Sequence, residues 1–307
     1  MGYRGIDAAE SRLKLLPPRD RSEDLHGLAL RAPNRSVCPT RRRPTTITLM
    51  TPIRVTSVDG VSLDAVIHYA DGARPRGTAV LAHGLTVDMD EGGMFIRLAE
   101  RLAETGFSVL RFSYRGHGRS DGTQRGVTIA GELLDLQAIV EYATTTLPEP
   151  RAIVAASFGA VSTALSLPYL DGVERLVLWN PVLDLIRTFV APELPWGLEN
   201  FSAAQQHLLH SQGFLRIDGS FELGRVMFEE FQLYHPHAAF TGDGRPALVV
   251  HGTHDTYVSF DIARDAALRR GCDIHPIQGS DHGFDSPERE DEAIQVTVEW
   301  LAERRTS

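Results

Sequence analysis

The chain has 307 residues, of which 42% are hydrophobic, so it can bury one large core. Its net charge is −9, and because the first fifty residues are net basic, the rest is more acidic than the whole. An acidic surface repels phosphate groups, which excludes nucleic acid and anionic membranes as expected partners. The cysteines, Cys38 and Cys272, form no disulfide framework or metal-ligand pattern, so we expect a cytoplasmic protein without a metal or cofactor.

Residues 1–49 differ in composition from the remainder of the chain. They are rich in arginine and proline and show no sustained apolar periodicity, which predicts a disordered basic extension. Their apolar runs are too short for a signal peptide or a membrane span, and their acidic residues argue against a transit peptide. Met50, directly before the first strand-like pattern, is a candidate start of the protein.

From residue 50 onward, strand and helix patterns alternate. Segments 53–58 and 61–68 predict an opening hairpin around a two-residue turn, Asp59-Gly60. Helical stripes follow at 94–102 and 133–143, and Ser286-Pro287 predicts the start of a terminal helix. Short apolar runs typical of buried parallel strands lie at 78–82, 107–112, 151–155, 175–179 and 247–251. The pattern predicts an α/β fold with a doubly wound, mostly parallel sheet.

A serine between small residues follows the run at 151–155. Ala155 and Gly159 stand two positions on either side of Ser157, which is a G-x-S-x-G pattern with alanine in the first place. Where a strand turns sharply into a helix, the residue at the apex is strained and exposes its side chain, and only small neighbours leave room. We therefore predict that Ser157 is a nucleophile.

An acid and a histidine follow in the remaining strand-end loops. Asp255 comes after the run at 247–251, and His282 comes after a short strand pattern at 273–277. Open parallel sheets place their sites at this edge, and the chain order serine, acid, histidine is that of a Ser-His-Asp triad. Asp184, after the preceding strand, is an alternative acid, whereas Asp281 is adjacent to the histidine and should point elsewhere.

The other histidines have simpler interpretations. His83 and His117 lie in turns, and His251 precedes the acid instead of following it. His235 and His237 lack a third partner for a metal ion, so no metal site is predicted.

With these residues in place, the chain from 54 to 303 resembles the serine hydrolases of the α/β-hydrolase fold, a group that includes carboxylesterases, acyl-thioesterases and S33 serine aminopeptidases. His83-Gly84-Leu85 matches the HG turn of that group, and residues 115–120 match its RGHGxS loop. Ser113 departs from the aspartate common at its position. The resemblance implies an oxyanion hole made by the backbone N–H groups of Leu85 and Phe158.

Residues 181–245 are too many for a plain crossover between two strands. We interpret this stretch as a helical cap insertion between two parts of the core, 50–180 and 246–307. Its aromatic residues at helical spacing are expected to wall an acyl pocket, although ordinary packing would use the same residues. The candidate substrate-binding residues are Phe201, Phe214 and Phe228.

These features predict a serine hydrolase that cleaves esters or thioesters of small or medium acyl groups through an acyl-enzyme. Its partner is expected to be a small-molecule acyl substrate. Because the insertion is acidic and would repel an acyl carrier protein, neutral esters are favoured. An acyltransferase or acyl-thioesterase with the same triad, and a noncatalytic binding protein on the same scaffold, are the alternatives.

Overall fold

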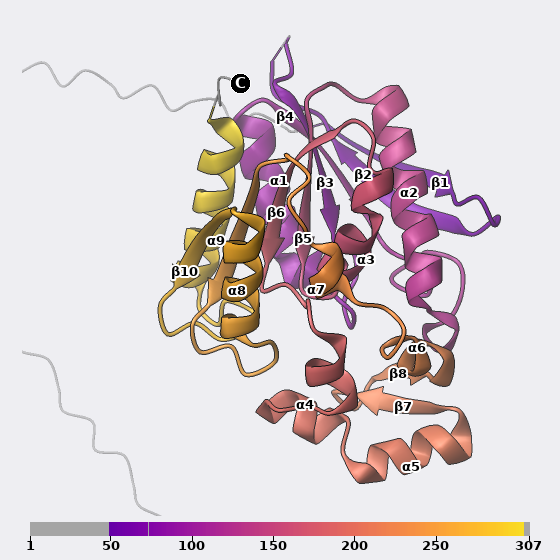
Figure 1. Ribbon diagram of the computed structural model, residues 1–307. Coiled ribbons are helices and arrows are strands. Elements are labelled where there is room, and N and C mark those ends of the chain that lie inside the picture. Colours follow the sequence, from indigo (N-terminus) through magenta and orange to yellow (C-terminus); the bar gives the residue numbers. More distant parts are fainter. Residues whose placement is uncertain (1–48, 73, 304–307) are drawn as a thin grey trace, which may run out of the picture. The chain divides into compact units, whose positions relative to one another are not determined.

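A central sheet organises the computed structural model, which describes residues 49–72 and 74–303 (Figure 1). Within these ranges eight strands form one sheet in the order β1-β2-β4-β3-β5-β6-β9-β10. The strands are β1 (Met50–Thr56), β2 (Ser62–His68), β3 (Gly77–Ala82), β4 (Phe107–Phe112), β5 (Arg151–Ala156), β6 (Val173–Trp179), β9 (Ala247–Gly252) and β10 (Asp273–Ile277). The predicted disordered extension, 1–49, lies outside the described residues apart from Leu49.

The strand pairing confirms the predicted fold class. β2 pairs antiparallel with β1 and with β4, and every other neighbouring pair is parallel. The prediction of a two-residue hairpin turn at Asp59-Gly60 was wrong. The N–H of Ser57 donates to the carbonyl of Val61, and the N–H of Gly60 donates to that of Ser57, so three residues, 58–60, form the loop. A glycine at φ +88° closes this longer turn, as in hairpins built from an ordinary turn and a left-handed residue.

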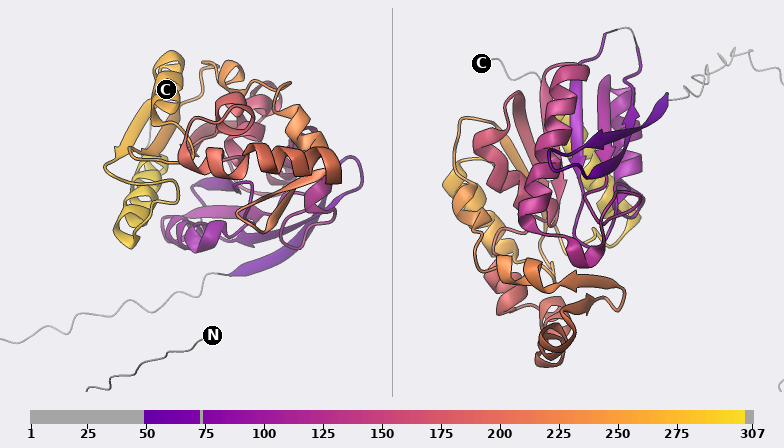
Figure 2. Two further views of the ribbon diagram at one scale, coloured as in Figure 1. Left: turned by 90° about the horizontal axis from the view of Figure 1, so that it is seen from below. Right: turned by 90° about the vertical axis from the view of Figure 1, so that its right-hand side faces the viewer.

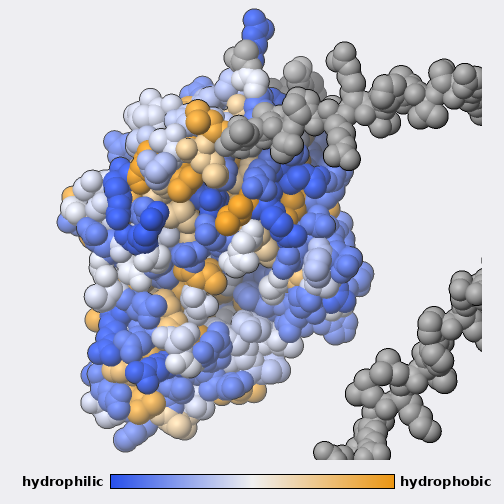
Figure 3. Space-filling view, turned by 180° about the vertical axis from the view of Figure 1, so that it is seen from behind, coloured by the Kyte–Doolittle hydropathy of each residue, from blue (hydrophilic) through white to orange (hydrophobic). Residues whose placement is uncertain are grey.

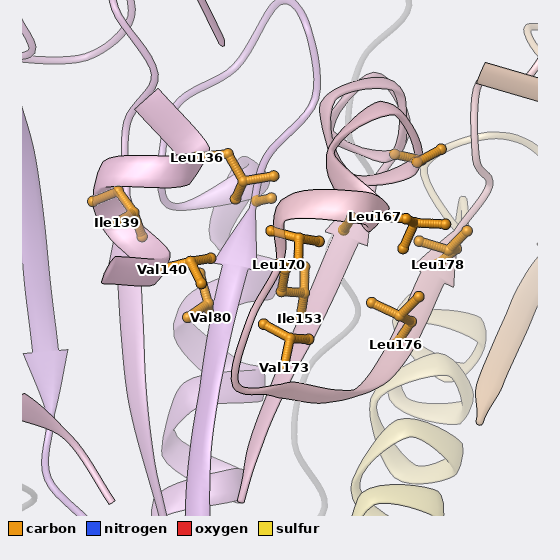
Figure 4. Close-up of a cluster of buried hydrophobic side chains, with 14 of the residues drawn as sticks. Val80, Leu136, Ile139, Val140, Ile153, Leu167, Leu170, Val173, Leu176 and Leu178 are labelled. Carbon is orange, nitrogen blue, oxygen red and sulfur yellow. The ribbon is translucent and has the colours of Figure 1, made fainter. Parts of the chain in front are cut away.

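Helices cover both faces of the sheet. α1 (Met94–Glu104) and α9 (Pro287–Ala302) pack on one face, and α2 (Ile129–Thr146), α3 (Gly159–Ser166) and α8 (Phe260–Arg270) pack on the other. Figure 4 shows side chains of α2 beside Val80 of β3, with side chains of β5 and β6 farther along the same buried cluster. The hydroxyl of Ser286 accepts a hydrogen bond from the first turn of α9, as the sequence predicts.

The segment between β6 and β9 contains more than helices. Its elements are η4 (Ile186–Val190), α4 (Pro195–Asn200), α5 (Ala203–Gln212), β7 (Phe214–Ile217), β8 (Phe221–Gly224), α6 (Arg225–Glu230) and α7 (Pro236–Ala239). Figures 1 and 2 show α4, α5, β7 and β8 gathered beyond the end of the sheet at which β6 finishes.

The expectation of an all-helical insertion therefore needs correction. β7 and β8 form an antiparallel hairpin, and Phe214 begins a strand instead of continuing a helix. Residues 218–220 join the strands. Asp218 and Gly219 have positive φ angles of 49° and 70°, and the N–H of Ser220 donates to the carbonyl of Ile217 at 3.1 Å, which closes a turn of the kind favoured in hairpins. Buried residues alternate along the hairpin, so the local pattern was that of strands.

On the face opposite to that of Figure 1, the surface of the described residues is mixed in hydropathy. In Figure 3, hydrophobic residues on that face stand in small groups separated by hydrophilic ones. Among the described helices, none is both long and apolar enough to cross a membrane.

Candidate active site

Ser157 occupies the turn between β5 and α3. Its backbone is left-handed, with φ +50°, and its N–H donates to the carbonyl of Trp179 at 2.8 Å. A side chain at Gly159 would meet the carbonyl oxygen of Ala82 at 2.4 Å, so only glycine fits there. Ala155, in contrast, is accommodated and fully buried. The small residues thus allow the sharp turn that exposes the serine hydroxyl.

A chain of hydrogen bonds joins Ser157 to the two strand-end residues that the sequence analysis selected. The Nε2 atom of His282 lies 2.9 Å from the Oγ of Ser157, and its Nδ1 lies 2.8 Å from the Oδ2 of Asp255. The other oxygen of Asp255 accepts the backbone N–H groups of Tyr257 and Val258, both at 2.8 Å. The buried carboxylate is therefore held in one orientation toward the imidazole.

The pKa shifts of His282 and Asp255 favour a charged imidazolium beside a charged carboxylate. Burial raises the pKa of Asp255, but the charge and hydrogen bond of His282 outweigh it and bring the net pKa below its usual value. Burial lowers the pKa of His282, whereas the charge and hydrogen bond of Asp255, with help from Glu91 and Asp281, raise it more. The net pKa of His282 lies above 6.5, which stabilises a proton taken from Ser157.

The competing acids point to other groups. Asp281 accepts hydrogen bonds from the backbone N–H and the hydroxyl of Thr256, at 2.7 and 2.9 Å. Asp184 accepts the backbone N–H of Arg187 at 3.0 Å. The structure thus brings Asp255, and neither alternative, to the Nδ1 of His282.

The other histidines hold turns or lie apart from Ser157. His83 accepts the N–H of Tyr114 through Nε2 at 2.9 Å, and His117 Nε2 donates to the carbonyl of Leu85 at 2.6 Å. His237 contacts Arg269. Within residues 49–72 and 74–303, no group of three or more side chains is arranged to hold a metal ion.

The two predicted oxyanion donors flank Ser157. Leu85 and Phe158 line the same cavity as the serine, and neither N–H donates to another residue in the described part of the chain. Phe158 stands at the start of α3, where the helix dipole is positive. Both N–H groups therefore stay candidates for the oxyanion hole that the resemblance implies.

The cavity beside Ser157 has a volume of about 290 Å³ and is mainly apolar. This is the size and character of a pocket for a small organic group. Glu91 and Glu290 are its acidic members. Its apolar lining comprises Leu85, Val87, Met94, Phe158, Val182, Phe189, Trp196, Tyr257 and Val258.

The three predicted substrate-binding phenylalanines are not among the described residues that line this cavity. Phe201 and Phe228 stack on each other with ring centres 6.2 Å apart, in a buried cluster that also includes Leu85 and Phe158. Phe214 lies under the guanidinium of Arg125, 3.7 Å from the ring centre. The helical spacing indicated which residues are buried, but not which buried residues face Ser157.

Aromatic stacking connects the insertion to the imidazole instead. The ring of Tyr257 lies parallel to that of His282, with centres 4.7 Å apart, and Trp196 stacks on Tyr257 at 4.8 Å. Trp196 lies in the first turn of the insertion's α4, and its indole N–H donates to Asp218 at 2.9 Å. Sequence reasoning missed both aromatic residues, because no local pattern shows that they meet His282.

Comparison with known proteins agrees with this geometry. Residues 73–214 match the family model described as serine aminopeptidase, S33. A Butyrivibrio proteoclasticus protein, Est1E, solved with ferulic acid, has 21% identity and a TM-score of 0.68 over 82% of this chain and 100% of its own. The chain has the α/β-hydrolase fold. No curated protein sequence matches it.

Two further solved structures share this α/β-hydrolase fold. An esterase from Pyrococcus furiosus has 20% identity and a TM-score of 0.64 over 83% of this chain and 91% of its own. The esterase domain of a Rhodothermus marinus protein has 17% identity and a TM-score of 0.63 over 83% and 98%. At these identities the similarity concerns the fold, so the activity is argued from the site.

The sequence analysis did not identify one further residue of the site. Glu91 lines the cavity, and its Oε2 accepts the N–H of Gly84 at 2.7 Å. Burial raises its pKa to about 7, although the bond from Gly84 and the charge of His282 lower it. The run Asp90-Glu91-Gly92-Gly93, soon after the HG turn, was the available signal.

Proposed function

We propose that this α/β hydrolase cleaves carboxylic esters of small or medium acyl groups, with Ser157 as the nucleophile. One observation carries the proposal: the hydrogen-bonded chain Ser157, His282, Asp255 opens onto a mainly apolar cavity of about 290 Å³. A serine hydroxyl needs a base within hydrogen-bond reach, and the 2.9 Å contact to His282 meets that need.

The first half of the reaction forms an acyl-enzyme. His282 takes the proton of Ser157 as the hydroxyl oxygen attacks the ester carbonyl, and Asp255 orients the imidazole and stabilises its charge. The carbonyl oxygen becomes an oxyanion that accepts the N–H groups of Leu85 and Phe158. When the tetrahedral intermediate collapses, His282 returns the proton to the departing alcohol.

The second half repeats these steps with water. His282 removes a proton from water, whose oxygen attacks the acyl carbon, and the second tetrahedral intermediate uses the same two N–H donors. Its collapse breaks the bond to Ser157, which regains its proton from His282, and the carboxylic acid leaves. A thioester would follow the same steps with a thiol as the leaving group.

The cavity lining supports an uncharged, largely apolar acyl group. Phe189 and Trp196 supply aromatic surface, and the described residues that line the cavity include no arginine or lysine to pair with an anionic substrate. The solved structures described as esterases, and the one that holds ferulic acid, are consistent with an ester of a small carboxylic acid. We propose a neutral small-molecule ester as the substrate.

The test is hydrolysis of p-nitrophenyl acetate, butyrate and octanoate by the wild-type protein and by Ser157→Ala. The variant removes one hydroxyl and should lose turnover of all three esters while its melting temperature stays unchanged. Ser211→Ala, at an exposed position of α5, is the matched control and should keep full activity. Turnover that persists in Ser157→Ala would overturn the proposal.

A further inference from the structure

Glu91 contacts the turn that carries a predicted oxyanion donor. Its Oε2 accepts the N–H of Gly84 at 2.7 Å. A Cβ atom on Gly84 would lie 3.3 Å from the Cβ of Ser157 and 3.4 Å from the Oε1 of Glu91. Gly84 is therefore enclosed between the serine and the carboxyl group, one residue before Leu85.

A hydrogen bond to the carbonyl of Gly84 orients the peptide unit that contains the N–H of Leu85. The Nδ1 of His83 donates to the carbonyl oxygen of Gly84 at 2.7 Å, and in a trans peptide the N–H of Leu85 points the opposite way. The carbonyl of Leu85 accepts from the Nε2 of His117 at 2.6 Å. With Glu91 on the N–H of Gly84, hydrogen bonds hold the backbone groups on both sides of the Leu85 N–H.

The backbone around Glu91 is strained. Glu91 has φ +47°, and Gly92 and Gly93 follow with φ +64° and +99°. Glycine adopts this left-handed region freely, but glutamate does not. A side chain held there persists only when its surroundings enforce it, and such residues cluster at functional sites.

The surroundings of Glu91 do enforce it. Arg111, buried in β4, binds the carboxylate of Asp90 and donates to the carbonyl of Met89 at 3.2 Å. The hydroxyl of Ser113 accepts the N–H of Met89 at 3.2 Å. The N–H of Glu91 itself donates to the carbonyl of Asp88 at 3.0 Å. The loop is thus fixed from the sheet, and its carboxyl group projects into the cavity.

We propose that Glu91 is a positioning residue for the oxyanion hole, in which its carboxyl group holds the N–H of Gly84 so that the N–H of Leu85 faces the oxygen of the tetrahedral intermediate. This inference rests on the proposed hydrolase function. It assigns to the Asp-Glu-Gly-Gly segment a part in transition-state stabilisation, separate from proton transfer by His282.

The charge of Glu91 has a second consequence. The charged groups near it are His282, Asp88 and Glu290, of which Glu290 is paired with Arg97. An ionised Glu91 raises the pKa of His282, so replacing it with glutamine should lower that pKa. Glutamine keeps an oxygen that can accept the N–H of Gly84, and it therefore separates the hydrogen bond from the charge.

The experiment compares Glu91→Ala, Glu91→Gln and Glu100→Ala, the last being an exposed glutamate of α1. We measure kcat and KM for p-nitrophenyl butyrate and the inhibition constant of a trifluoromethyl ketone, which forms a tetrahedral oxyanion on the serine. Removing a whole oxyanion donor costs about 10²–10³ in kcat, so losing its positioning group should cost about 10-fold or more.

Glu91→Ala should lower kcat and weaken ketone binding by similar factors, with KM nearly unchanged. Glu91→Gln should restore most of both and move the acidic limb of the kcat/KM profile to lower pH. Glu100→Ala should match the wild type. If Glu91→Ala does not fold, Glu91→Met keeps the length of the side chain without an acceptor and replaces it.

Two results would overturn the inference in an active enzyme. One is a Glu91→Ala variant with wild-type kcat and ketone affinity, and the other is a Glu91→Gln variant as impaired as the alanine variant. A wild-type protein that neither hydrolyses esters nor binds the ketone would instead overturn the proposed function, together with the inference that rests on it.

Discussion

The strand-end loops and the insertion between β6 and β9 contribute to the site in different ways. The loops supply polar groups whose hydrogen bonds leave little freedom, as in the contacts of 2.8 and 2.9 Å through His282. The insertion supplies aromatic surface, of which Phe189 and Trp196 line the cavity. This difference indicates that chemistry and substrate preference can be changed separately.

The contribution of the strand-end loops to the chemistry can be tested first at Asp255. Asp255→Asn should lower kcat by about 10⁴-fold, the loss found for the equivalent change in serine proteases, because the imidazole loses the partner that fixes its tautomer. The fold should remain, which circular dichroism can check. Asp184→Asn is the control, and a loss of activity there instead would show that Asp184 is the acid.

The tight packing of the turn at Ser157 can be tested by its effect on stability. In Gly159→Ala, the new methyl group would meet the carbonyl oxygens of Ala82 and His83 at 2.4 and 2.7 Å. Overpacking of this kind costs about 1–3 kcal/mol, and each kcal/mol lowers Tm by roughly 2–4 °C in a domain of this size. Thermal unfolding measures the loss, with Gly126→Ala, at the exposed end of the short 3-10 helix η2 (Gln124–Gly126), as the control. An unchanged Tm would show that the turn has more room than the structure indicates.

The same two regions explain how much the sequence could predict. Ser157, Asp255 and His282 each follow a short apolar run, and such runs end in loops at one edge of a parallel sheet. Local signals were sufficient there. The insertion lacks that constraint: helical spacing identified Phe201 and Phe228 as buried, but their partners depend on packing between distant segments.

Glu91 and Tyr257 illustrate the same limit within the loops. The role of Glu91 depends on Arg111 and Ser113, which fix its loop from a strand some twenty residues away. Tyr257 meets His282 only because two loops of the sheet edge converge. The β7–β8 hairpin, in contrast, had a local signal in Asp218-Gly219 that the spacing of aromatic residues obscured.

A third prediction concerns the contribution of the insertion to acyl-chain preference. Trp196→Ala removes cavity wall without touching Ser157, so the ratio of kcat/KM between octanoate and acetate esters should change, by about 10-fold or more. Phe214→Ala, outside the cavity, should leave the ratio unchanged. Equal ratios in both variants and the wild type would mean that the strand-end loops alone determine the preference for acyl-chain length.

The smallest expected effect is a displacement of the pH profile. His282 must be neutral to accept a proton, so kcat/KM should fall as the pH drops through its pKa. Since Asp255, Glu91 and Asp281 together raise that pKa despite burial, the acidic limb should lie above pH 6.5. A midpoint at or below 6.5 would contradict the assigned contacts of His282.

The most direct test of the central claim is covalent labelling of the nucleophile. The wild-type protein is treated with a fluorophosphonate, and the adduct is located by mass spectrometry of the intact protein and of its peptides. We predict a single adduct, on Ser157, because its hydroxyl lies 2.9 Å from the Nε2 of His282. Ser157→Ala should remain unlabelled. An adduct on another residue, or labelling that persists in Ser157→Ala, would show that Ser157 is not the nucleophile.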